Sequence, residues 1–138
     1  MPEETQTLDS FIDIDTSNVP DAKVLPEGEV RVRLKACEQK LSSKQNPMIV
    51  CQYTIPSEPL VDDLYFYVNL PHAGQEEGAQ MKSARAFGKW KDAHGLPQKG
   101  GIDLVQLGNS GLELFVFVGI EEYQGEKKNR LQKFIRKA

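Results

Sequence analysis

The chain has no long apolar run and few of the residue types on which redox or metal chemistry depends. Its 138 residues include two cysteines, two histidines and one tryptophan. No stretch of 18 apolar residues is present, so a membrane-spanning helix is not expected, and the acidic residues 1–4 do not resemble a secretory signal. Cys37 and Cys51 are too few for a disulfide scaffold. We therefore expect a reduced cytoplasmic protein that does not associate with membranes.

Motifs of enzyme active sites are also missing. The sequence has no G-x-S-x-G nucleophile turn, no Walker loop and no G-x-G-x-x-G dinucleotide motif. Its two cysteines and two histidines are well separated, whereas zinc ligands come in close pairs. We expect His72 and His94 to be exposed and to have no role. The sequence thus predicts a protein that is not an enzyme and that needs no metal and no cofactor.

Charge is divided unevenly along the chain. Residues 1–22 carry six acids and no base, whereas residues 23–138 carry 14 acids and 17 bases, six of which lie between residues 127 and 137. Such blocks are typical of a mobile arm or of a polyanion partner, although they could equally pair with each other or be solvated. We expect residues 1–22 to form a flexible acidic arm and residues 23–138 to form the folded domain. Phe11, Ile12 and Ile14 make a short apolar patch in the arm and are candidates for binding a partner protein.

Hydrophobic periodicity predicts five strands and one helix. The strands cover residues 29–37, 48–55, 64–70, 112–120 and 129–136, and the helix covers residues 76–94. The strand at 112–120 is apolar on both faces and should be central in the sheet or well covered. Trp90 lies in the apolar stripe of the helix, so we expect it in the core rather than in a binding site.

The first two strands form a hairpin around a turn at residues 42–47. Of two competing registers we prefer the one with Lys44 and Gln45 at the tip, because a slip by one residue would bury the basic side chains. This register pairs Leu34 with Ile55. It places Cys37 and Cys51 on opposite faces, which argues against a disulfide between them.

The order strand, strand, strand, helix, strand, strand suits a small closed sheet. We expect an all-β fold with one helix, namely a five-stranded Greek-key barrel of the oligonucleotide-binding (OB) type. The helix is expected between the third and fourth strands. Such barrels bind oligomers over their second and third strands and the neighbouring loops.

Aromatic and basic residues on these strands match what single-stranded nucleic acid binding requires, which is flat rings for the bases and cations for the phosphates. Tyr65 and Tyr67 are two residues apart on one strand, so their rings project from one face. The candidate nucleic-acid-binding residues are Arg31, Arg33, Lys35, Lys44, Tyr65, Tyr67, Lys127, Lys128, Arg130 and Lys133. In the alternative, the tyrosines are covered by a loop or by the arm, and the basic side chains are only a solvated edge.

Three segments resemble the phage single-stranded-DNA-binding proteins with an OB fold. They are residues 26–34, residues 43–48 with a Ser-Lys-x-Asn-Pro-like turn, and residues 107–111 together with residues 121–131. The resemblance covers roughly residues 24–136 and implies binding of single-stranded DNA, without sequence preference, during phage replication or recombination in the host cytoplasm. Members of that group typically carry an acidic C-terminal tail that recruits replication partners. Here the C-terminus is basic, so either the acidic N-terminal arm has taken over the contact with replication or recombination proteins, or partner recruitment works differently.

Two other functions fit the same residues. One is a small phage adaptor or protein-interaction module whose acidic arm binds a host protein. The other is an RNA-binding protein of the same fold, because contacts to the sugar hydroxyl cannot be read from a sequence. The sequence does not predict an oligomeric state.

Overall fold

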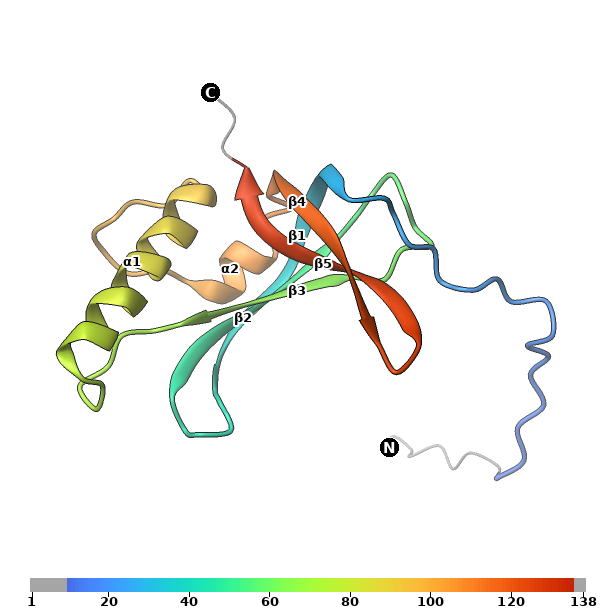
Figure 1. The fold of residues 1–138 in the computed structure, drawn as a ribbon, viewed down its shortest axis with the longest axis horizontal. Coiled ribbons are helices and arrows are strands. Elements are labelled where there is room, and N and C mark those ends of the chain that lie inside the picture. Colours follow the sequence, from blue (N-terminus) through green and yellow to red (C-terminus); the bar gives the residue numbers. More distant parts are fainter. Residues whose placement is uncertain (1–9, 136–138) are drawn as a thin grey trace, which may run out of the picture.

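Five antiparallel strands form a single sheet in the order β3-β2-β1-β4-β5 (Figure 1). The computed structural model describes residues 10–135; residues 1–9 of the predicted arm, and Arg136 and Lys137 of the basic C-terminal segment, lie outside the described residues. The strands are β1 (Gly28–Leu41), β2 (Pro47–Thr54), β3 (Leu64–Asn69), β4 (Glu113–Tyr123) and β5 (Glu126–Ile135). The strand that is apolar on both faces, β4, lies between β1 and β5, as its composition predicted.

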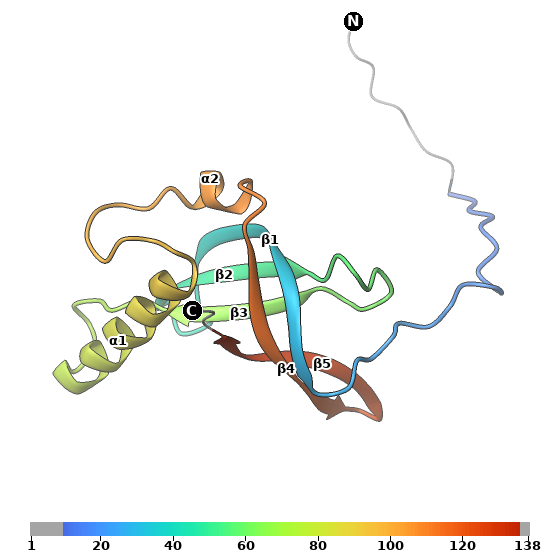
Figure 2. The same ribbon diagram turned by 90° about the horizontal axis from the view of Figure 1, so that it is seen from above.

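The first strand is long enough to pair with two partners in turn. Residues 28–33 of β1 pair with β4, and residues 33–41 pair with β2. Between the Leu34 and Ala36 pairs the register shifts, so Lys35 is an extra residue on β1, and a bulge of this kind bends its strand. Figure 2 shows β1 turning from the direction of β4 to that of β2. The two halves of the sheet curl toward each other, and the edge strands meet where Phe66 and Phe134 are 4.8 Å apart between ring centroids.

The predicted pairing of β1 with β2 is wrong. Leu34 pairs with Tyr53 rather than with Ile55, and Cys37 pairs directly with Cys51. The difference begins at the turn, because Ser42 pairs with Asn46 and the turn has three residues, 43–45, in place of the predicted two-residue tip. The bulge then adds one more residue and reverses which side chains of β1 face inward between Leu34 and the turn. The two cysteines therefore face the core together as free thiols, with 3.8 Å between their Sγ atoms.

The sheet is open in the part of the chain that the structure describes, since β3 and β5 remain edge strands without a ladder between them. The predicted closure of the sheet into a barrel is therefore not seen in the described residues. The helix prediction also needs a correction, because two helices lie between β3 and β4: α1 (Glu77–Ala93) and a short α2 (Leu104–Gly108). The main helix, α1, packs beside β3 and β5, whereas α2 packs on β1. Neither helix is long and apolar enough to cross a membrane.

The core lies inside the curl of the sheet and is covered by α1. Trp90 is buried as predicted and stacks on Phe87. The prediction of an exposed His94 is wrong, because this residue ends α1 facing inward and is only 3% exposed. Its ring lies 4.5 Å from that of Trp90, between centroids. His72 is half-buried rather than exposed.

Residues 10–22 contain no helix or strand and extend away from the sheet (Figures 1 and 2). The chain joins the fold at Lys23, whose backbone N–H donates to the carbonyl oxygen of Leu60 at 2.8 Å. Two residues later, the backbone N–H of Leu25 donates to Oδ1 of Asn129 at 2.8 Å, and Nδ2 of Asn129 donates to the Leu25 carbonyl at 2.9 Å. The segment before β1 is thus fixed to both edges of the sheet.

Candidate nucleic-acid interface

The third strand presents two open tyrosine rings on the outer face of the sheet. Tyr65 and Tyr67 are 49% and 58% exposed, while Leu64 and Val68 of the same strand are buried. The alternation of β3 side chains between the two faces produces this division. Neither a loop nor the described part of the arm covers the rings, so the alternative of covered tyrosines does not hold for residues 10–135.

Arg31 and Arg33 of β1 lie on the same outer face, but a carboxylate on β4 neutralises part of their charge. Arg33 donates from Nε and Nη2 to Oε2 of Glu113, at 3.1 and 2.7 Å. Nε of Arg31 is 3.7 Å from Oε1 of the same carboxylate. The hydrogen bond from Arg33 holds the pKa of Glu113 below its ordinary value, so the carboxylate is ionised at neutral pH. The two arginines together therefore offer a net charge of about one.

Lys35, the bulge residue, reaches across β2 toward the start of β3. Its Nζ lies 3.3 Å from Oδ2 of Asp63, and Nε2 of Gln52 donates to the same oxygen at 2.7 Å. Gln52 is the direct β2 partner of Tyr65. The Lys35 ammonium thus lies close to the tyrosine strand, although an acid already accompanies it.

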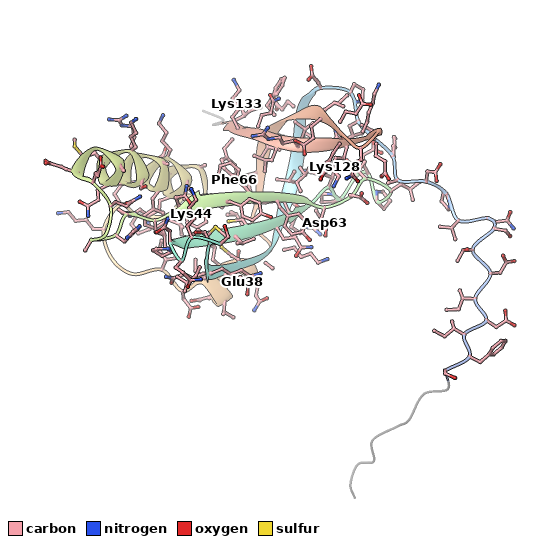
Figure 3. The ribbon with its side chains drawn as sticks, turned by 60° about the horizontal axis from the view of Figure 1, so that its bottom comes forward. Glu38, Lys44, Asp63, Phe66, Lys128 and Lys133 are labelled. Carbon is pink, nitrogen blue, oxygen red and sulfur yellow. The ribbon has the colours of Figure 1, made fainter. Side chains whose placement is uncertain are left out.

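A cleft of about 870 Å³ separates β3 from β5. One wall comes from residues 62–67, which include both tyrosines, and the other comes from Glu121 and residues 128–132. Figure 3 shows Asp63 and Lys128 extending into this region from opposite sides. The ring pair of Phe66 and Phe134 lies where the two strands meet, and the hydrogen bonds of Asn129 to residue 25 hold the chain against the opposite part of β5.

The basic side chains of the β4–β5 hairpin differ in the contacts that they already make within the protein. Lys127 and Lys128 make no ion pair with the residues that the structure describes, whereas Nη1 of Arg130 is 3.9 Å from Oε1 of Glu121. Lys128 and Arg130 line the cleft. Lys133 instead stands over the ring of Phe117, with Nζ 5.8 Å from the ring centroid.

The predicted residues therefore fall into two groups. Tyr65 and Tyr67 are flanked by Lys35 across β2 and by Lys128 and Arg130 across the cleft. Farther away lie Arg31 and Arg33, one strand beyond β2; Lys133, on β5 beside Phe117 of β4; and Lys44 and Lys127, in or beside the two hairpin turns. The structure brings the first group together around one surface, and the others surround it at a greater distance.

Several residues at this surface were missed by the sequence analysis. Glu113 lies opposite Arg33 only because β1 pairs with β4, and no local pattern indicated that pairing. Asn129 and Gln132 line the cleft because β5 ends up opposite β3, which again depends on the curl of the whole sheet. The sequence around these three residues carried no local signal for either placement.

Phe11, Ile12 and Ile14 of the arm are 79%, 74% and 75% exposed. They point to no surface of the folded domain and form an apolar patch among acidic residues. Within residues 10–135, no group of three or more histidines, cysteines or acids is placed to hold a metal ion.

Comparison with known proteins identifies one family. Residues 12–137 match the model of a family described as "Protein of unknown function (DUF669)". Because this match spans most of the chain, the protein belongs to that family. No curated protein matches the chain.

Proposed function

We propose that this family member binds single-stranded DNA without sequence preference, with bases stacked on Tyr65 and Tyr67. The observation that carries the proposal is the pair of open rings between two sources of positive charge, Lys35 on one side and Lys128 with Arg130 on the other. Stacking on an aromatic ring tolerates any base, and cations beside the rings neutralise the phosphates. The more distant candidates Arg31, Arg33, Lys44, Lys127 and Lys133 would add a diffuse attraction.

We also infer that the fold is an OB-type barrel with a partly open seam. Three features support this: β1 pairs with both β2 and β4, β3 and β5 approach each other through Phe66 and Phe134, and α1 packs beside both edges. The OB barrel is described as partly open and as binding oligomers over its second and third strands. Together with the resemblance to phage proteins, this favours protection of single strands during phage replication or recombination.

Binding is tested by fluorescence anisotropy with a labelled oligo-dT at several salt concentrations. The logarithm of affinity should fall with the logarithm of salt by about 0.7 for each phosphate neutralised. Replacing both tyrosines, in Y65A/Y67A, should weaken binding at least about tenfold, because each stacked base contributes roughly 1–3 kcal/mol. The matched variant Y65F/Y67F keeps the rings and should bind like the wild type.

A flat salt response would contradict the electrostatic part of this proposal. Equal binding by Y65A/Y67A and the wild type, with unchanged thermal stability, would contradict the stacking part. The same titration with oligo-U distinguishes RNA from DNA. Clearly tighter binding of oligo-U would replace DNA by RNA in the proposal.

The exposed patch of Phe11, Ile12 and Ile14 favours a second candidate function, recruitment of a replication or recombination protein by the arm. Large apolar side chains open to water on an acidic segment are suited to docking in a basic, apolar-floored groove. The test is a pull-down from nuclease-treated host lysate with the full chain and with F11A/I12A/I14A. A partner retained by both proteins would rule out this role for the patch.

A further inference from the structure

Two arginines of β1 hold one carboxylate between them on the outer face of the sheet. Arg31 and Arg33 are separated by one residue, so their side chains leave the same face, and Glu113 of β4 is the cross-strand partner of Arg33. One carboxylate oxygen accepts two hydrogen bonds from Arg33, and the other lies 3.7 Å from Arg31. This is the geometry of an anion subsite that the protein's own acid occupies.

The occupant is held loosely enough to be exchanged. The side chains of Arg31, Arg33 and Glu113 are 57%, 50% and 33% exposed, and ion pairs so open to water contribute little to stability. The guanidinium fork matches a phosphate as well as it matches a carboxylate. A phosphate arriving from solvent can therefore replace the carboxylate without disturbing the core.

We propose that Glu113 is an internal phosphate surrogate, which a phosphate of the bound single strand displaces from Arg31 and Arg33. This inference rests on the proposed function, because it concerns the same nucleic-acid surface. Its consequence is that Glu113 lowers affinity: each binding event must first separate the carboxylate from the two guanidinium groups. Glu113 thereby reduces the net positive charge that β1 offers to the phosphates of the strand.

The test compares oligo-dT binding by the wild type and by Glu113→Gln, which removes the charge but keeps the shape. We expect E113Q to bind more tightly, on the order of two- to fivefold at low salt, the range of an exposed ion pair. The matched control is Glu77→Gln in the first turn of α1, which changes the net charge equally and makes no ion pair with the described residues. E77Q should bind like the wild type.

A second comparison isolates the arginine pair. R31A/R33A should lose little affinity in the wild-type background, where Glu113 occupies the pair, and should lose more in the E113Q background. If the wild type binds DNA and E113Q binds no more tightly than E77Q, the surrogate role is wrong while the proposed function stands. If neither the wild type nor E113Q binds any oligonucleotide, the proposed function itself is wrong and the surrogate role falls with it.

Discussion

The hydroxyl oxygen of Tyr53 lies 2.7 Å from Nε2 of His94, inside the core between β2 and the end of α1. The other ring nitrogen, Nδ1, lies 2.7 Å from the carbonyl oxygen of Trp90. A carbonyl can only accept, so Nδ1 carries the proton and Nε2 accepts from the Tyr53 hydroxyl. Both nitrogens are thus paired in the neutral ring. Burial lowers the pKa of His94 to about 4, with the hydrogen bond to Trp90 acting in the opposite direction.

This arrangement predicts a loss of stability in mild acid. The unfolded chain takes up a proton on His94 near pH 6.5, whereas the folded chain does so only near pH 4. The contribution of the neutral His94 ring to the free energy of unfolding is complete above pH 6.5. As the pH falls to 4, the free energy of unfolding decreases by about 3 kcal/mol. Urea unfolding at several pH values measures it, and the pH dependence should be flatter in His94→Gln. His72→Gln, the control, should keep the wild-type dependence; equal slopes in wild type and H94Q would contradict the prediction.

A second prediction concerns the contact between α2 and β1. A Cβ added to Gly108 would lie 3.0 Å from the backbone nitrogen of Cys37 and 3.2 Å from Cα of Ala36. These are backbone atoms of a paired strand and cannot move aside as a flexible side chain can. We expect Gly108→Ala to destabilise the fold by about 1–3 kcal/mol, the usual cost of overpacking. Thermal unfolding should show this, whereas Gly101→Ala, where a Cβ meets nothing within 4 Å, should stay within about 0.5 kcal/mol of wild type.

The cysteine pair leads to a third prediction. Directly opposed residues of antiparallel strands have Cα atoms about 4.5–5.5 Å apart, within the range that a disulfide spans. With diamide, the thiols of Cys37 and Cys51 should therefore form an intramolecular disulfide, each losing a proton and an electron as diamide is reduced to the hydrazine. The reaction should be slow, because both thiols are buried in the core and are poorly accessible to the reagent.

Intact mass and alkylation in denaturant would measure this oxidation. The expected product is a monomer lighter by two hydrogens and without reactive thiols. Cys51→Ser is the control and should form no such product. Two alkylated thiols in the wild type after prolonged treatment would show that the pair does not close.

The same cysteines show where prediction from the sequence ended. The spacing of apolar residues located all five strands and the main helix, because that spacing is a local property of each segment. A bulge has no comparable local signature, and the extra residue Lys35 changed the orientation of Cys37. His94 was missed for a similar reason, since the direction of a helix-capping residue depends on what the helix packs against.

The candidate site was predictable only for those features that depend on one β-strand alone. The exposure of Tyr65 and Tyr67 follows from the period of β3, and the structure has them open. The pairing of Arg33 with Glu113, and the cleft opposite Lys128, depend on contacts between distant strands. Such contacts determine how much of each predicted charge is available to a ligand.

That difference in availability gives the last prediction, a ranking of the cations. Lys128 lines the cleft beside the tyrosines and makes no ion pair within residues 10–135, whereas Arg31 shares the carboxylate of Glu113. We expect Lys128→Ala to weaken oligo-dT binding more than Arg31→Ala does, and to reduce the salt slope by about 0.7, the value for one phosphate contact. Lys89→Ala on α1 removes the same charge away from the cleft and should have little effect. If Lys89→Ala weakened binding as much as Lys128→Ala, the attraction would reflect net charge alone, and the cleft would have no part in holding the strand.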